Sequence, residues 1–141
     1  DYTRVVNGRN PIVAHEYLGD SVEGKTVFIA DDIIASGESM LEVASNLKAR
    51  GAKRIIADAT FPLFTSGLDK FDKAVEEGTL DYVVGTNLTY RKPELLNRDW
   101  YVDVDVSKYA AYFIVALNHD MSVSSIIDPI KKIEALLASR K

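Results

Sequence analysis

Apolar residues along this chain fall into short runs that suit buried strands and longer stretches with helical spacing. Residues 27–30 and 54–60 are short apolar runs bounded by turn residues, which predicts two buried strands. Residues 81–85 and 101–104 predict two more strands on the same grounds. A short hairpin is also expected ahead of the first strand, with residues 12–17 extended.

Helical spacing marks the segments between and after these strands. A helix is expected over about residues 39–50, and Gly51 suits the left-handed residue that ends many helices. The same spacing predicts helices that end at Gly78, begin near Val106 and begin at Pro129, with this proline as the first helical residue. Strands and helices therefore alternate, which predicts an α/β fold with a mainly parallel sheet and helices on both faces.

The composition narrows the class of protein. A length of 141 residues suits a single domain over residues 1–141, and the absence of cysteine excludes disulfides and thiolate chemistry. Twenty-one acidic residues against 17 basic ones argue against nucleic acid as a partner. Without an apolar run near ~20 residues or a signal sequence, neither a membrane span nor secretion is expected. We expect a cytoplasmic protein with a small-molecule ligand.

Residues 26–40 combine an apolar strand, two adjacent acids and the start of a helix. Four residues with small or polar side chains stand at this start: Ser36, Gly37, Glu38 and Ser39. Unpaired backbone N–H groups, two hydroxyls and the positive end of the helix would converge there, which suits a phosphate. Asp31 and Asp32 beside it suit ribose hydroxyls or a hydrated Mg²⁺. Each feature alone is ordinary; their order within one segment predicts a sugar-phosphate site.

The segment resembles the phosphoribosyl-pyrophosphate motif of type I phosphoribosyltransferases and ribose-phosphate pyrophosphokinases. That motif has four apolar residues, two acids, two apolar residues, often an acid, and then Thr-Gly-x-Thr. Here serine replaces both threonines, and Ala35 stands where most members carry aspartate. The resemblance implies a type I phosphoribosyltransferase-like fold, with Asp31 and Asp32 on the ribose hydroxyls, directly or through Mg²⁺. It also implies that the 5-phosphate of ribose 5-phosphate is bound by Ser36, Gly37, Glu38 and Ser39.

The flanking segments resemble the second half of ribose-phosphate pyrophosphokinases. Residues 10–19 and 22–25 are similar to the segment ahead of the acid pair. Residues 86–87 match a Thr-Asn at the next strand end, and residues 118–124 resemble the family's C-terminal stretch. At residues 61–62, Phe-Pro replaces the usual His-Gly. Because the chain also begins at Asp1 without methionine, we expect a C-terminal fragment of a two-domain protein.

This resemblance implies ribose-phosphate diphosphokinase activity, in which the anomeric hydroxyl of ribose 5-phosphate attacks the β-phosphorus of Mg-ATP to make phosphoribosyl pyrophosphate. The family's ATP site draws on the first half and on a neighbouring subunit, which implies a homo-oligomer and a fragment that is inactive alone. Its catalytic cations lie on a mobile loop. Arg4 and Arg9 are the loop cations left in this sequence, and a catalytic role and a solvated surface role are both open for them.

Two alternatives stay open from the sequence. The first is a nucleobase phosphoribosyltransferase, which Ala35 disfavours because the family's aspartate handles a proton on the base in many such enzymes. A pyrophosphokinase has no nucleobase to protonate, so the loss of this acid affects its chemistry less. The second alternative is a non-catalytic regulatory homologue that retains the phosphate site and has lost the chemistry.

Overall fold

The computed structural model describes residues 19–139 of the chain. The chain divides into two compact units, one up to Val104 and one from Asp105 onward, and each is described by itself. The first unit alternates strands and helices in the order β1 (Thr26–Ile34), α1 (Glu38–Ala49), β2 (Arg54–Pro62), α2 (Asp69–Glu76), β3 (Tyr82–Thr86), α3 (Pro93–Leu96) and β4 (Tyr101–Val104). The hairpin expected at residues 12–17 lies outside the described residues, and a single domain over residues 1–141 stays a prediction.

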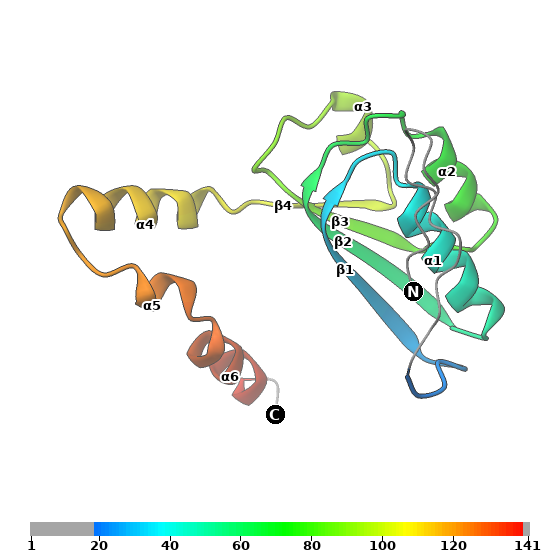
Figure 1. Ribbon diagram of the computed structural model, residues 1–141, viewed down its shortest axis with the longest axis horizontal. Helices are drawn as coiled ribbons and strands as arrows, with labels where there is room; N and C mark the ends of the chain where they lie inside the picture. Colours follow the sequence, from blue (N-terminus) through cyan, green and yellow to red (C-terminus); the bar gives the residue numbers. More distant parts are fainter. Residues whose placement is uncertain (1–18, 140–141) are drawn as a thin grey trace, which may run out of the picture. The chain divides into compact units, whose positions relative to one another are not determined.

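The four strands form one parallel sheet in the order β1-β2-β3-β4 (Figure 1). Its register places one row of side chains across all four strands: Ile29, Ala57, Val83 and Tyr101. Because every pair is parallel, the carboxyl ends of the strands share one edge, where ligand-binding loops are expected. The α/β class and the mainly parallel sheet are confirmed.

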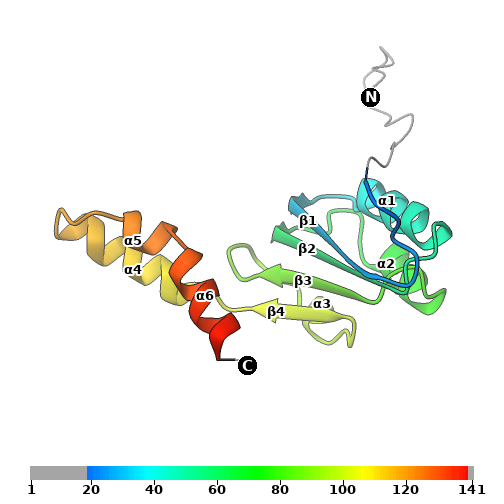
Figure 2. The same ribbon diagram turned by 90° about the horizontal axis from the view of Figure 1, so that it is seen from below.

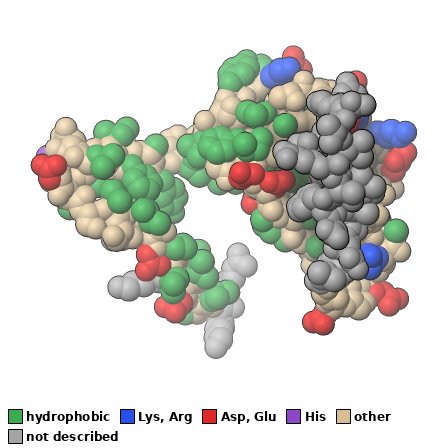
Figure 3. Space-filling view, in the orientation of Figure 1, with side chains coloured by type: hydrophobic (Ala, Val, Ile, Leu, Met, Phe, Trp, Pro, Cys, Tyr) green, Lys and Arg blue, Asp and Glu red, His purple; other side chains and the backbone are tan. Residues whose placement is uncertain are grey.

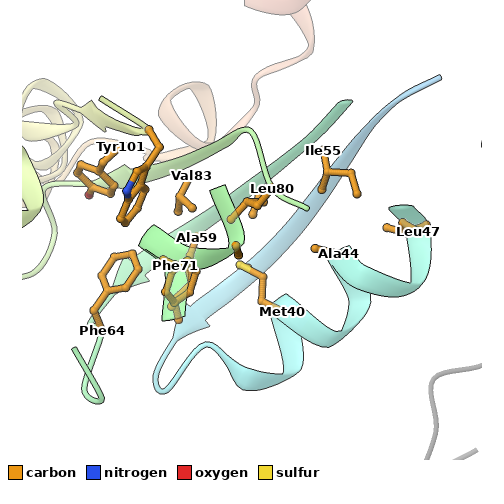
Figure 4. Packing of buried hydrophobic residues seen from close by; sticks show 14 of the residues in the cluster. Met40, Ala44, Leu47, Ile55, Ala59, Phe64, Phe71, Leu80, Val83 and Tyr101 are labelled. Carbon is orange, nitrogen blue, oxygen red and sulfur yellow. The ribbon is translucent and has the colours of Figure 1, made fainter. Parts of the chain in front are cut away.

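Helices α1 and α2 cover one face of this sheet (Figures 1 and 2). Met40, Ala44 and Leu47 of α1 point toward the sheet together with Phe71 of α2 (Figure 4). The predicted apolar face of α1 is therefore confirmed, and Gly51 ends this region with a φ of 86°, as expected.

The opposite face of the sheet carries large apolar side chains that are exposed within the first unit. Phe28, Tyr82 and Val102 are 59, 39 and 43% exposed. Parallel sheets normally have both faces covered. Coverage of this second face stays a prediction.

The second unit is helical, with α4 (Ser107–Asn118), α5 (Ser124–Ile127) and α6 (Ile130–Ala138). The amide of Ser107 donates to Asp105 Oδ1 at 2.9 Å, so Asp105 marks the start of α4. The amide of Ile130 donates to Asp128 Oδ1 at 3.0 Å, so Asp128 marks the start of α6. Pro129 was expected to be the first helical residue of α6, but it lies just before the helix. The helix therefore begins one residue later than predicted. None of the helices within residues 19–139 is long and apolar enough to cross a membrane.

Candidate functional site

The two adjacent acids lie inside β1, which corrects the expectation that the strand ends before them. β1 continues to Ile34 because Ile33 and Ile34 still pair with residues of β2, Phe61 and Pro62. Asp31 and Asp32 are both exposed, and the amide of Asp32 donates to Asp31 Oδ1 at 2.8 Å. Figure 3 shows acidic side chains gathered near the carboxyl end of β1.

A hollow of about 120 Å³ lies between the end of β1 and the start of α1; we call it the β1–α1 hollow. Its lining consists of Asp31 and residues 33–40. The fold therefore gathers one acid of the pair and all four predicted phosphate-binding residues around one space. Asp32 is not part of this lining.

Gly37 forms the backbone turn between β1 and α1 that lines the hollow. Its φ of 80° is left-handed, a conformation that favours glycine, and α1 begins at the next residue, Glu38. The amides in the first turn of a helix have no partner within the helix, so they are available for an anion at this end. Ser36 Oγ already accepts from the amide of Glu38, although the contact is long at 3.4 Å.

The loop between β2 and α2 supports the β1–α1 hollow through backbone hydrogen bonds. The amides of Leu63 and Phe64 both donate to the carbonyl of Ile34, at 2.9 and 3.1 Å. The amide of Thr65 donates to the carbonyl of Ala35 at 2.9 Å. This support could not be predicted from the sequence, because bonds between main-chain groups leave no signal in the pattern of side chains.

A cation from α2 also reaches this site. Lys70 Nζ forms a hydrogen-bonded ion pair with Glu38 Oε1. Lys70 was not predicted from the sequence either, since nothing in the motif indicates a lysine on the following helix. Glu38, predicted as a phosphate-binding residue, is thus held in an ion pair.

Aromatic rings pack around Phe71 of α2, next to the hollow. The ring of Phe71 stacks on that of Trp100 at 5.9 Å and meets the ring of Phe64 edge-on at 4.9 Å. Next to it, Asp72 accepts hydrogen bonds from Arg98 Nε at 2.8 Å and from Trp100 Nε1 at 2.7 Å. The bond from Arg98 is the main cause that lowers the pKa of Asp72, with partial burial acting against it and Trp100 adding to it.

The ends of β2 and β3 meet at the same edge of the sheet. Thr86 Oγ1 donates to the carbonyl of Thr60 at 2.7 Å, which joins the ends of β2 and β3. Arg4 and Arg9, the candidate catalytic cations, lie outside the described residues.

The donor set for a metal is small. Within residues 19–139, no group of three or more His, Cys, Asp or Glu side chains could hold an ion. Asp31 and Asp32 remain as two exposed carboxylates within β1, near its carboxyl end. This suits Mg²⁺, which is commonly held by one or two carboxylates and keeps several waters or substrate oxygens.

Comparison with known proteins shows what this chain is similar to in sequence. The family model described as "Phosphoribosyl synthetase-associated domain" matches residues 6–128. A ribose-phosphate pyrophosphokinase of Vibrio cholerae is 30% identical over 111 residues, which cover 79% of this chain and 34% of that protein. An orotate phosphoribosyltransferase of Oceanobacillus iheyensis is 41% identical over 64 residues, covering 45% of this chain and 30% of that protein.

A solved structure has the same fold. The phosphoribosylpyrophosphate synthetase of Mycobacterium smegmatis superposes with a TM-score of 0.62 at 24% identity, over 72% of this chain and 33% of that one. The chain thus spans about a third of the length of the curated pyrophosphokinases that it matches, such as the 34% in Vibrio cholerae. Through its phosphoribosyl synthetase-associated domain, the chain belongs to the ribose-phosphate pyrophosphokinase family.

Proposed function

We propose that this chain is the ribose 5-phosphate-binding part of a ribose-phosphate diphosphokinase. The observation that carries the proposal is the left-handed Gly37 at the start of α1, beside Asp31, in a member of this family. Backbone N–H groups and the positive helix end suit a phosphate there. The hydroxyls of Ser36 and Ser39 would add two donors, and Gly37 lets the backbone approach the ligand closely.

Asp31 and Asp32 are assigned to the sugar. Their carboxylates would accept hydrogen bonds from ribose hydroxyls, directly or through Mg²⁺, which in this chemistry neutralises charge on the phosphates. Holding the sugar in one orientation would aim its anomeric hydroxyl, the group that attacks the β-phosphorus of ATP and releases AMP. Such positioning can supply much of the catalysis in phosphoryl transfer.

The remaining parts of the reaction are assigned outside the described residues. Arg4 and Arg9 are proposed as cations for the ATP phosphates, with ATP itself held largely by other parts of a longer protein and by a neighbouring subunit. On this proposal the enzyme is a cytoplasmic homo-oligomer. The 141-residue chain alone binds ribose 5-phosphate and does not catalyse.

A nucleobase phosphoribosyltransferase is the second candidate. The stretch shared with an orotate phosphoribosyltransferase supports it, since 64 residues are 41% identical. Both candidates need the same sugar-phosphate site. Ala35 favours the pyrophosphokinase, because it offers no carboxylate for a proton on a base.

Thermal unfolding of the 141-residue chain with ribose 5-phosphate tests the proposal. A ligand that binds only the folded state stabilises it by about 2.7 kcal/mol at 100 times its Kd, so Tm should rise. The double variant Ser36→Ala and Ser39→Ala should lose this rise. Ser45→Ala, an exposed serine farther along α1, is the matched control and should keep it.

Three outcomes separate the candidates. If neither ribose 5-phosphate nor phosphoribosyl pyrophosphate changes the Tm of the unmutated chain, the proposed site is wrong. A response to orotate in the presence of phosphoribosyl pyrophosphate would favour the base transferase. Binding of ribose 5-phosphate without any diphosphoryl transfer in the longer protein would favour the non-catalytic homologue.

A further inference from the structure

Three consecutive amides of the loop between β2 and α2 donate hydrogen bonds to the connection between β1 and α1. These amides belong to residues 63–65, and they reach the carbonyls of Ile34 and Ala35 at 2.9–3.1 Å. We call residues 34–37 the phosphate turn, because they lead from β1 to the proposed phosphate-binding end of α1. Successive amides of an extended strand point to opposite sides, so three amides that converge on one turn require a different backbone conformation.

Phe64 provides this conformation. Its φ of 46° is left-handed, and a left-handed residue allows neighbouring amides to converge. For a residue with a bulky side chain this conformation is strained, and it persists only where the surrounding structure holds it in place. Glycine adopts it without such strain, so the presence of phenylalanine indicates a role for its ring.

The ring of Phe64 packs against the aromatic side chain that lies next to the phosphate turn. It meets the ring of Phe71 edge-on, with the two ring centroids 4.9 Å apart (Figure 4). Phe71 in turn fills the space beside Gly37, where a Cβ atom would lie 2.3 Å from its ring. Phe64 and Phe71 are only 4 and 0% exposed, so neither ring can move unless the core repacks.

We propose that Phe64 is a positioning residue for the phosphate turn: its backbone directs the loop amides to Ile34 and Ala35, and its ring keeps Phe71 against Gly37. Phe64 is not among the residues that line the β1–α1 hollow, so it acts through the turn and not by contact with the ligand. The inference rests on the proposed binding of ribose 5-phosphate. A turn that has its final shape before the ligand arrives binds more tightly, because little remains to be ordered on binding.

Calorimetric titration of ribose 5-phosphate into Phe64→Leu tests the inference. Leucine keeps an apolar side chain but lacks the ring that meets Phe71, so the Kd should rise by roughly three- to tenfold as binding must then order the turn. Leu80→Val is the matched control. Leu80 is 1% exposed in the same core and lies just ahead of β3, at the amino edge of the sheet. Its truncation should lower the free energy of unfolding and leave the Kd unchanged.

Two further variants separate the backbone of Phe64 from its ring. Phe64→Gly and Phe64→Ala both lose the ring, but only glycine adopts the left-handed conformation without strain. Phe64→Gly should therefore bind ribose 5-phosphate more tightly than Phe64→Ala does, and both should bind it more weakly than the unmutated chain. Urea unfolding without ligand gives the folded fraction of each variant, for which its Kd is corrected.

Amide hydrogen exchange measures the shape of the turn without any ligand. In Phe64→Leu, exchange should accelerate by a larger factor at the amide of Thr65, which donates to Ala35, than at the amide of Val83, which donates to Trp100. Leu80→Val should accelerate exchange at Val83 at least as much as at Thr65. This measurement also tests the inference if the glycine and alanine variants do not fold.

The possible failures lead to different conclusions. If Phe64→Leu leaves the Kd within about twofold of the unmutated value, or if Leu80→Val raises the Kd equally, the inference is wrong and the proposed function stands. The same holds if Phe64→Ala binds as tightly as Phe64→Gly. If the unmutated chain binds no ribose 5-phosphate, the proposed function fails first. Unchanged exchange at Thr65 in Phe64→Leu would show, independently of any ligand, that Phe64 does not position the turn.

Discussion

The ring edge of Phe71 occupies the space next to Gly37 in which a side chain at that position would have to lie. A Cβ atom on Gly37 would come within 2.3 Å of both Cε2 and Cζ of this ring. Phe71 cannot turn away easily, because it is fully buried and stacked on Trp100. The loop that starts α1 therefore packs directly against the buried ring of Phe71.

Substitution of Gly37 by alanine should destabilise the fold by about 2–4 kcal/mol. About 1–2 kcal/mol comes from the left-handed backbone and the rest from the clash with Phe71. Urea unfolding measures the loss, and Gly67→Ala is the control, because Gly67 has a φ of 83° with no atom within 4 Å of its would-be Cβ. Equal losses at both positions would show that the contact with Phe71 carries no energy. Adding Phe71→Leu should make Gly37→Ala less costly.

Gly85 is expected to be intolerant of a side chain for steric reasons alone. Its Cβ would lie 2.4 Å from Tyr101 Oη and 2.7 Å from Pro62 Cγ. Overpacking of this kind typically costs about 1–3 kcal/mol, so Gly85→Ala should lower the free energy of unfolding by that amount. In a Tyr101→Phe background the loss should shrink, since the nearest atom is gone. A loss that is the same in both backgrounds would contradict this geometry.

The hydroxyl of Tyr101 contributes little to stability at neutral pH. It is buried, and among the described residues it has no hydrogen-bond partner. Removing an unpaired polar group costs little, so Tyr101→Phe should change the free energy of unfolding by less than about 1 kcal/mol. A larger loss would mean that the hydroxyl has a partner.

Tyr101 should also make the free energy of unfolding depend on pH in alkaline solution. Burial is the main cause that raises the pKa of Tyr101 to about 12, and nearby Asp103 adds to it. The folded chain holds this proton more tightly than the unfolded chain, whose tyrosine loses it near pH 10. The stability that depends on it is thus present below pH 10 and lost as the pH rises through about 12. Unfolding of the unmutated chain across this range should show a loss that Tyr101→Phe lacks.

Asp72 should contribute stability that acid removes. Its hydrogen bond from Arg98 is the largest cause that lowers its pKa below the ordinary 3.8. Because the folded pKa is the lower one, the contribution is present above pH 3.8 and is lost as the pH falls through the folded value. Thermal unfolding followed from above pH 3.8 into more acidic solution should therefore show a smaller acid loss for Asp72→Asn. An acid loss for Asp72→Asn equal to that of the unmutated chain would contradict this expectation.

Local patterns predicted most of the first unit correctly. The four strands and the helices α1 and α2 could be predicted because the spacing of apolar residues reflects which side of each element is buried. The motif from Asp31 to Ser39 was readable because its residues are consecutive. The helices α3 and α5 were missed, since each has only four residues and offers no period to detect.

The predicted end of β1 was wrong because it also depends on contacts that are distant in sequence. Acids are rare in strands, so the strand was expected to end before Asp31 and Asp32. In the structure, β1 pairs with β2 as far as Ile34. Hydrogen bonding to a neighbouring strand depends on residues that are distant in sequence.

By itself, then, the sequence determined the alternation of strands and helices and the chemistry of the residues from Asp31 to Ser39, because both depend on neighbours along the chain. Only the tertiary structure decided what surrounds those residues. It placed Phe71 under Gly37 and Lys70 beside Glu38, contacts between segments more than thirty residues apart. Such contacts arise when packing against the sheet brings α2 next to α1, and no local pattern records that event.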